Sequence, residues 1–296
     1  MDDPTRDDPA PQGIPPGRPE HPDAEAARPD AGVPEPIDAP PIEPGAVRAV
    51  AELLHAAGHV VVLTGAGVSA ESGIDTFRQP QTGLWSRYDP MALASVQALR
   101  RDPALVTRWY HWRFGRCARA MPNRGHLALA ELERRAHRAG RAFTLLTQNV
   151  DGLHQRAGSR NVVELHGSIL RWRCERTGWS CGIEQVDFGQ YPPRSPAGGT
   201  LRPDIVLFGE ALPEEALLAA QRAVASCDLM LVVGTSAVVY PAAGFIEWAV
   251  ERGVPTVEVN PQATAMTAAV TYALAGPSGR VLPALLRCVE ALDRSA

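Results

Sequence analysis

The sequence predicts an α/β protein with a doubly wound, parallel, Rossmann-like sheet. After residue 45, short apolar runs rich in β-branched residues alternate with alanine-rich amphipathic stretches, the pattern of strands and helices in regular succession. The runs are nearly continuous, which is typical of parallel strands buried on both faces. A glycine-rich loop directly follows the first run, where such sheets often bind phosphate groups. The expected strands cover residues 59–63, 143–146, 162–165, 229–233 and 254–259.

Three pieces of the chain depart from this pattern. Residues 1–45 hold 13 of the 27 prolines and 11 acidic residues against three arginines, which predicts a disordered tail. Residues 91–138 have the periodicity of helices, and residues 172–200 are irregular. We therefore expect one folded domain over 46–296. Its large part comprises 46–90, 141–171 and 201–296, and its small part is inserted as 91–140 and 172–200.

Composition and charge exclude several functions. The 29 basic residues are all arginine and stand against 33 acidic residues, so nucleic acid and anionic membranes are poor partners, and a catalytic lysine is excluded. The most apolar stretch, 228–250, is interrupted by polar residues, so we expect neither an export signal nor a membrane span. Five scattered cysteines do not resemble a disulfide framework, which indicates a cytoplasmic protein.

The loop after the first strand has the spacing G-x-G-x-x-A over residues 65–70. Its bare backbone and the following helix N-terminus could bind a pyrophosphate. An ordinary dehydrogenase would continue with an unbroken helix and a second strand that ends in an acidic residue. Here Gly73 ends the helix early, and Asp89 lies between a loop and a proline. The loop predicts nucleotide binding without hydride transfer, although a glycine turn needed only for packing would also have this spacing.

The segment GAGVSAESGIDTFR at residues 65–78 resembles the cofactor loop of the sirtuins, which are NAD-dependent protein deacylases. Five further blocks resemble the family in the same order: TQNVDGLH at 147–154, LHGS at 165–168, RPDIVLFGE at 202–210, GTS at 234–236 and VNP at 259–261. Together they span most of residues 46–296. The resemblance implies a protein-lysine deacylase that consumes NAD, releases nicotinamide and transfers the acyl group from lysine to ADP-ribose.

Catalytic roles follow from this resemblance for two residues. A neutral imidazole at His166 could take a proton from a ribose hydroxyl at neutral pH, and Asn149 resembles the family's residue in the nicotinamide pocket, together with Asp151 and Ile74. Two other interpretations remain open, a protein ADP-ribosyltransferase and a non-catalytic NAD-sensing module. The residues expected to contact NAD are Gly65, Ala66, Gly67, Ser69, Ile74, Asp75, Phe77, Arg78, Trp85, Gln148, Asn149, Asp151, Gly234, Thr235, Ser236, Asn260 and Ser278.

The resemblance also implies how an acyl-lysine protein substrate is held. Val206, Phe208 and Gly209 belong to the segment that pairs with a substrate peptide through its backbone. Tyr110 and Arg113 lie three residues apart in a helical stretch and so face the same way. A Tyr-x-x-Arg pair at this place resembles the subgroup that removes succinyl or malonyl groups, in which the arginine pairs with the distal carboxylate.

The expected zinc ribbon at residues 172–200 is degenerate. Sirtuins usually carry two Cys-x-x-Cys pairs, but here the partner position of Cys174 holds Thr177, and Arg194 and Ala197 occupy the second pair. Only Cys181 supplies another nearby thiol, which leaves too few ligands for a tetrahedral site. We therefore predict that zinc is absent and that aromatic burial orders the module instead. The aromatic candidates are Trp172, Trp179, Phe188 and Tyr191.

Overall fold

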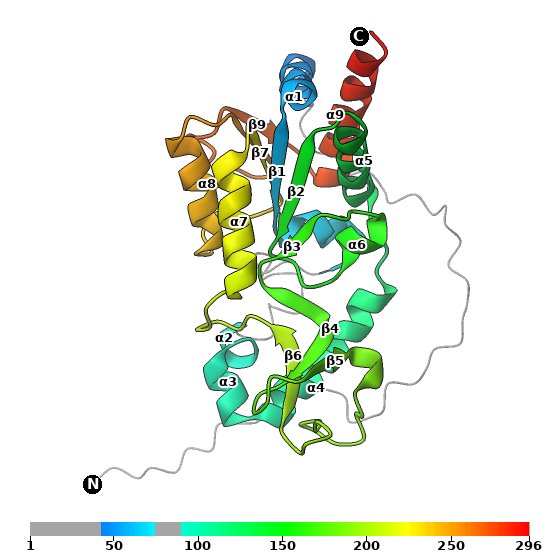
Figure 1. Cartoon of the computed structure of the whole chain (residues 1–296), viewed down its shortest axis with the longest axis vertical. Helices are drawn as coiled ribbons and strands as arrows, with labels where there is room; N and C mark the ends of the chain where they lie inside the picture. Colours follow the sequence, from blue (N-terminus) through cyan, green and yellow to red (C-terminus); the bar gives the residue numbers. More distant parts are fainter. Residues whose placement is uncertain (1–42, 75–89, 296) are drawn as a thin grey trace. The chain divides into compact units, whose positions relative to one another are not determined.

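The computed structural model describes residues 43–74 and 90–295, and within them two sheets (Figure 1). The larger sheet has six parallel strands in the order β3-β2-β1-β7-β8-β9. Its strands are β1 (His59–Thr64), β2 (Ala142–Thr147), β3 (Val162–Glu164), β7 (Leu229–Val233), β8 (Thr256–Asn260) and β9 (Tyr272–Ala275). The expected doubly wound sheet is confirmed, with β9 as an additional edge strand. Most of the predicted tail lies outside the described residues.

The strand order places the candidate site at one edge of this sheet. The chain begins in the middle with β1, adds β2 and β3 on one side, and later adds β7, β8 and β9 on the other. Thr64 at the end of β1 is in register with Thr147 of β2 and Val233 of β7. The carboxyl ends of three strands therefore meet at the point where the strand order reverses, which is the usual ligand site of such sheets.

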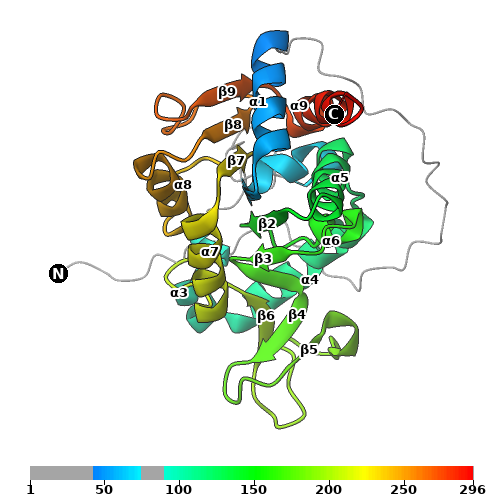
Figure 2. The same ribbon diagram turned by 45° about the horizontal axis from the view of Figure 1, so that its top comes forward.

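Helices cover both faces of the large sheet (Figure 2). One face packs against α1 (Pro44–Ala56), α5 (Arg124–Arg138) and α9 (Ser278–Asp293), and the other against α7 (Glu214–Ser226) and α8 (Ala242–Glu251). Within β1, Val60 and Val62 lie in the first core cluster, whereas Val61 and Leu63 lie in the second. This alternation explains the unbroken apolar runs of the central strands β1 and β7, which contribute side chains to two cores.

A second, antiparallel sheet has the order β5-β4-β6 and consists of β4 (Gly167–Cys174), β5 (Ser180–Gly182) and β6 (Leu201–Ile205). The helices α2 (Pro90–Leu93), α3 (Val96–Arg101) and α4 (Pro103–Arg119) pack against it through a third core cluster. The segment 91–140, which we expected to be one inserted piece, is divided between the two parts. Its last helix, α5, packs on the large sheet through Leu129 and Leu132.

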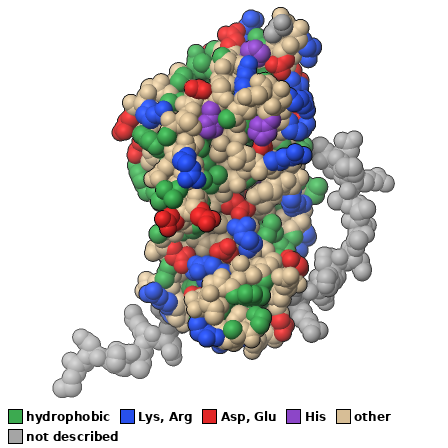
Figure 3. Space-filling model, viewed as in Figure 1, with side chains coloured by type: hydrophobic (Ala, Val, Ile, Leu, Met, Phe, Trp, Pro, Cys, Tyr) green, Lys and Arg blue, Asp and Glu red, His purple; other side chains and the backbone are tan. Residues whose placement is uncertain are grey.

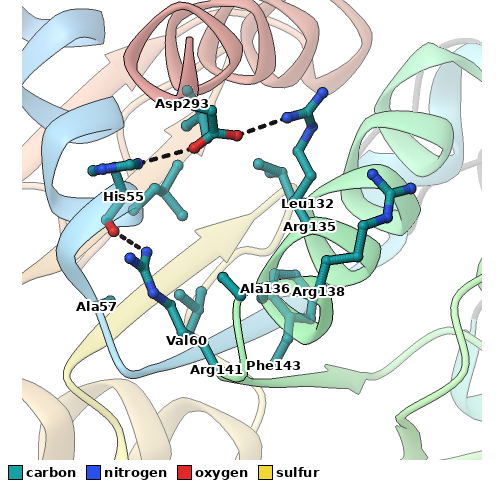
Figure 4. A pocket seen from close by; sticks show the side chains of 13 residues that line it. His55, Ala57, Val60, Leu132, Arg135, Ala136, Arg138, Arg141, Phe143 and Asp293 are labelled. Atoms are coloured by element: carbon teal, nitrogen blue, oxygen red, sulfur yellow. Dashed lines mark hydrogen bonds and ion pairs between the residues drawn. The ribbon is translucent and has the colours of Figure 1, made fainter. Parts of the chain in front are cut away.

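An ion-pair cluster covers the amino-terminal ends of β1 and β2 (Figure 4). Arg135 of α5 pairs with Glu290 and Asp293 of α9, and Asp293 also contacts His55 of α1. A cavity of about 370 Å³ is lined by His55, Arg135 and Asp293, together with Arg141, which donates a hydrogen bond to the carbonyl of His55 (Figure 4). The cavity therefore lies at the amino-terminal ends of the strands, whereas the candidate site lies at their carboxyl ends.

The surface carries both charge signs. Acidic and basic side chains lie interspersed over the face seen in Figure 3, and neither sign covers it. No helix within residues 43–74 and 90–295 is both long and apolar enough to cross a membrane.

Candidate active site

The glycine-rich loop follows β1 and continues into the 3-10 helix η1 (Ala66–Ser72). The amide of Gly67 donates a hydrogen bond of 2.7 Å to the carbonyl of Gly234, which follows β7. A Cβ atom added at Gly67 would lie 2.7 Å from that oxygen, and Gly234 has a φ of +60°. The two loops thus touch through their backbones, and this close approach requires glycine at both positions.

Hydrogen bonds to the starts of two distant helices, α5 and α9, fix η1. Asn123, the N-cap of α5, donates to the carbonyl of Val68 at 2.8 Å and to the hydroxyl of Ser72 at 3.0 Å. Glu71 accepts from the amide of Gly279 at 2.7 Å at the start of α9, where a carboxylate is favoured by the helix dipole. Glu71 also accepts from the Ser278 hydroxyl. Ser278 was predicted from the sequence as a cofactor contact, whereas Glu71 and Asn123 were not.

Asn149 and Asp151, two of the three residues expected around nicotinamide, are joined by hydrogen bonds through Ser69. The Asn149 amide donates to the carbonyl of Gly65 at 3.0 Å and to the Ser69 hydroxyl at 3.1 Å. The Ser69 hydroxyl donates to Asp151 at 2.8 Å, and the amide of Leu153 donates to the other oxygen of Asp151 at 2.9 Å. Burial raises the pKa of Asp151, against these hydrogen bonds. The structure therefore brings together three predicted site residues, Ser69, Asn149 and Asp151.

Two buried histidines, His126 and His154, lie next to this group. The Thr64 hydroxyl donates to Thr147, so it accepts from Nε2 of His154 at 3.0 Å. The His126 ring lies 4.8 Å from the ring of His154 and contacts Ser69. Burial lowers the pKa of His126 to about 4 and that of His154 well below its usual value. Both rings are therefore neutral at pH 7. Neither histidine was predicted from the sequence as a site residue.

Three of the residues expected to contact NAD, Gln148, Thr235 and Asn260, are joined by hydrogen bonds at Thr235. Its hydroxyl accepts from the Gln148 side chain at 3.0 Å, and its carbonyl accepts from the Asn260 side chain at 3.0 Å. Ser236 follows it in the chain, and Ala237 next to it has a φ of +56°, a left-handed conformation that is rare for alanine. Residues from the ends of β2, β7 and β8 are thus joined at one point of the sheet edge.

His166 lies between β3 and β4, close to these strand ends. Its Nδ1 is 3.0 Å from the carbonyl oxygen of Gln148, and because a carbonyl can only accept, Nδ1 carries the proton and Nε2 is left as the basic nitrogen. Burial lowers the pKa of His166, although this hydrogen bond opposes the effect. The neighbouring Gly167 has a φ of +73°, and a Cβ there would lie 2.2 Å from the Asp204 carbonyl.

The expected peptide-binding segment 206–209 is held at both ends. The Val206 amide donates to the carbonyl of His166, and Phe208 exchanges backbone hydrogen bonds with Ala94 and Val96. Phe208 is 41% exposed and Gly209 has a φ of +92°. This arrangement leaves the apolar side chain of Phe208 at the surface, two residues after the backbone contact with His166.

A buried ion pair supports the same segment. Arg202 is 2% exposed and contacts both carboxylate oxygens of Glu210, at 2.6 and 3.1 Å. Glu210 also accepts from the Leu207 amide at 2.9 Å. Burial alone would raise the pKa of Glu210, but the hydrogen bonds from Arg202 and Leu207, with nearby positive charge, hold it below its usual value. The carboxylate is therefore charged at neutral pH.

Tyr110 and Arg113 lie on α4 beside this ion pair. Tyr110 is 3% exposed, and burial raises its pKa to about 12 despite the charges of Arg113 and Arg202. The Arg113 guanidinium lies 5.4 Å from the centre of the Trp109 ring. Its charge also lowers the pKa of Asp151 against the effect of burial. The charge of Arg113, the predicted acyl-binding arginine, thus acts on Asp151, one of the residues expected around nicotinamide.

The donor set of the small sheet does not fit a zinc ion. Cys174 accepts a hydrogen bond of 3.3 Å from the Ser195 hydroxyl, and Cys181 lies on β5. Within residues 43–74 and 90–295, no three His, Cys, Asp or Glu side chains are grouped as metal ligands, whereas structural zinc takes four. The absence of zinc itself stays a prediction. The cofactor candidates Asp75, Phe77, Arg78 and Trp85 lie outside the described residues.

Comparisons with known proteins agree with this geometry. The model of the Sir2 family matches residues 65–241. An NAD-dependent protein deacylase of Deinococcus radiodurans is 53% identical over 237 residues, which are 79% of this chain and 95% of that protein. NAD-dependent protein deacylase 2 of Pyrobaculum aerophilum is 51% identical over 242 residues, 81% of this chain and 95% of that protein.

Solved structures show the same likeness. A Sir2 homologue in complex with ADP-ribose superimposes with a TM-score of 0.78 at 42% identity, over 84% of this chain and 98% of that one. A Sir2 homologue in complex with NAD has a TM-score of 0.75 at 43% identity, over 82% of this chain and 94% of that one. The chain therefore belongs to the Sir2, or sirtuin, family.

Proposed function

We propose that this enzyme, an NAD-dependent protein-lysine deacylase, removes succinyl and malonyl groups as well as acetyl groups. The observation that supports the acidic-acyl preference is that Tyr110 and Arg113 lie together on α4, with the charge of Arg113 close enough to Asp151 to lower its pKa. Relatives that are about 50% identical in sequence are named NAD-dependent protein deacylases, and a structural neighbour binds a myristoylated histone peptide. These names support protein-bound acyl-lysine as the substrate class.

NAD, when bound, supplies the ribose carbon that receives the acyl oxygen as nicotinamide leaves. The bare backbone of the loop at Gly65 and Gly67 would hold the pyrophosphate. Asn149 and Asp151 would orient the carboxamide, because they present an amide and a carboxylate that Ser69 joins. His166 would accept a proton from a ribose hydroxyl at Nε2, since its Nδ1 is committed to the Gln148 carbonyl.

Arg113 supplies the charge that an acidic acyl group requires. Arg113 is a half-buried residue, so its attraction to a substrate carboxylate is screened less than at an exposed site. A charge-assisted hydrogen bond is worth about 1.5–3 kcal/mol, which corresponds to roughly tenfold to hundredfold in kcat/KM. The buried phenol of Tyr110 stays protonated at neutral pH, and its hydroxyl can donate a hydrogen bond to the same carboxylate.

Two further expectations belong to this proposal. The enzyme folds and works without zinc, which the mismatch of the thiol donor set supports. It acts in the cytoplasm, which is supported by five cysteines that are all free thiols in the described chain.

The test compares succinyl-lysine and acetyl-lysine peptides of the same sequence. Arg113→Met should lower kcat/KM for the succinyl peptide by about tenfold to hundredfold and leave acetyl turnover within about twofold. Arg119→Met, at the exposed end of the same helix, should change neither. Equal losses with both peptides in Arg113→Met would contradict the proposed acyl preference.

A further inference from the structure

An aromatic contact joins α4 to the irregular segment that follows β5. The His111 ring of α4 stacks on Phe188 with the ring centres 3.6 Å apart and the planes inclined by 13°. Nδ1 of His111 lies 2.5 Å from the Tyr191 hydroxyl. Phe188 meets the edge of Trp172, a fully buried side chain of β4, at 5.1 Å and 81°. We call these four residues, His111, Phe188, Tyr191 and Trp172, the aromatic clasp.

The clasp engages one stripe of α4. Arg108, His111 and Phe114 are spaced by three residues and so lie along one side of the helix. The Arg108 guanidinium lies 5.1 Å from the centre of the Tyr191 ring, and Phe114 packs against the core of the small sheet. Burial lowers the pKa of His111, so the stacked ring is uncharged at neutral pH.

A different stripe of the same helix carries the acyl-binding pair. Tyr110 and Trp109 are buried in the third core cluster with Ile169 and Leu207, and their rings meet edge to face at 4.5 Å. Tyr110 directly precedes His111 in the chain. Any shift or rotation of α4 at His111 therefore displaces Tyr110 and Arg113 as well.

Two core clusters order the sheet that the clasp holds. One packs it against α2, α3 and α4. The other, at the clasp, has six buried residues, among them Trp172, Cys174 and Cys181, and its two thiols do not fit a zinc site. Stacked and edge-to-face rings have a preferred geometry, so they restrain orientation as well as burying apolar area. A contact of this kind can set the position of α4 relative to β4.

We propose that the aromatic clasp positions α4 so that Tyr110 and Arg113 reach the distal carboxylate of an acidic acyl group. His111 and Phe188 are then positioning residues for acyl specificity. This inference rests on the proposed preference for acidic acyl groups. It assigns the clasp no role with acetyl-lysine, whose acyl group carries no distal carboxylate and so makes no ion pair with Arg113.

The experiment measures kcat/KM with matched succinyl and acetyl peptides for His111→Ala and Phe188→Ala. A misplacement on the order of 1 Å costs up to about hundredfold, so we expect succinyl turnover to fall at least about tenfold relative to acetyl turnover. Phe188→Tyr keeps a ring for His111 to stack on and should retain the wild-type ratio. Trp179→Ala, which removes a 43% exposed aromatic side chain of the same module, is the matched control and should also retain it.

The outcomes separate this inference from the function on which it rests. An unchanged ratio in His111→Ala and Phe188→Ala, or an equal loss with both peptides, would overturn the positioning role. If both alanine variants fail to fold, Tyr191→Phe decides, because it removes only the hydroxyl that contacts His111, and the ratio should fall. If Arg113→Met leaves kcat/KM unchanged with both peptides while the wild type is active, the proposed preference for acidic acyl groups is wrong. In that case the clasp positions no acyl-binding pair.

Discussion

Removing the negative charge of Glu210 tests how the substrate segment is held. Glu210→Gln keeps an oxygen that can accept from the Leu207 amide, but it leaves the Arg202 guanidinium, 2% exposed, without a carboxylate. Breaking a buried ion pair by removing one partner costs about 3–5 kcal/mol. Arg202 keeps the carbonyl of Ile205 at 2.7 Å as an acceptor, and the Glu210 side chain is 21% exposed. We therefore expect Glu210→Gln to lower the free energy of unfolding by about 3 kcal/mol, near the lower end of this range.

For a domain of this size, that loss corresponds to a fall in Tm of roughly 6–12 °C. Thermal unfolding followed by circular dichroism at pH 7 measures it, with Glu251→Gln at the exposed end of α8 as control. Peptide KM should rise more than kcat falls, because the segment 206–209 loses its support. A Tm within about 2 °C of the wild type would refute the reasoning.

The same pair predicts a pH dependence with a definite sign. The pKa of Glu210 is lowered in the folded protein, so its stabilising contribution is complete above the unfolded value of about 4.3. It is lost as the pH falls through the lower folded value. The difference in stability between wild type and Glu210→Gln should be constant from about pH 6 to 8 and shrink below about pH 4.

Three further predictions concern the active site and the small sheet. Because burial lowers the pKa of His166, the acid limb of the kcat/KM profile should lie below the ordinary histidine pKa of about 6.5, and His166→Ala should lose about 10²–10⁴-fold in kcat while still binding NAD in calorimetry. Gly67→Ala should raise the KM for NAD, because its Cβ would lie 2.7 Å from the Gly234 carbonyl, whereas Gly45→Ala, with open space around it, should not. Prolonged dialysis against a chelator should leave Tm and turnover unchanged, and a stoichiometric zinc signal in metal analysis of the purified protein would contradict the zinc-free account.

The large sheet could be predicted because its strands carry their signal locally. The central strands β1 and β7 are apolar runs that supply two cores, as Val61 and Val62 do. The edge strand β9 lacks that signal, since only Leu274 of its four residues is buried. The antiparallel sheet also escaped prediction, because β4 pairs with β6 across a register shift between Ser168 and Trp172, which no local pattern encodes.

The candidate site could also be predicted only where its signal is local in the sequence. Residues in contiguous motifs, such as Asn149 and Asp151, were found because their chemistry is visible in the sequence. Contacts such as that between Glu71 and Gly279 join residues 208 positions apart and were missed. We expected buried aromatic side chains to order the small module. Trp172 is buried as expected, but the expectation is wrong for Trp179, which is 43% exposed. The role of His111 depends on stacking that only the fold creates.

The most direct test of the central claim is to quantify the products formed from NAD and a succinyl-lysine peptide. We predict that the wild type releases nicotinamide and forms succinyl-ADP-ribose in equal amounts, and that His166→Ala forms almost none of the latter. Nicotinamide release with ADP-ribose attached to protein would instead indicate an ADP-ribosyltransferase. NAD binding without cleavage, with either a succinyl or an acetyl peptide, would contradict the assignment of His166, Asn149 and Asp151 as a catalytic centre.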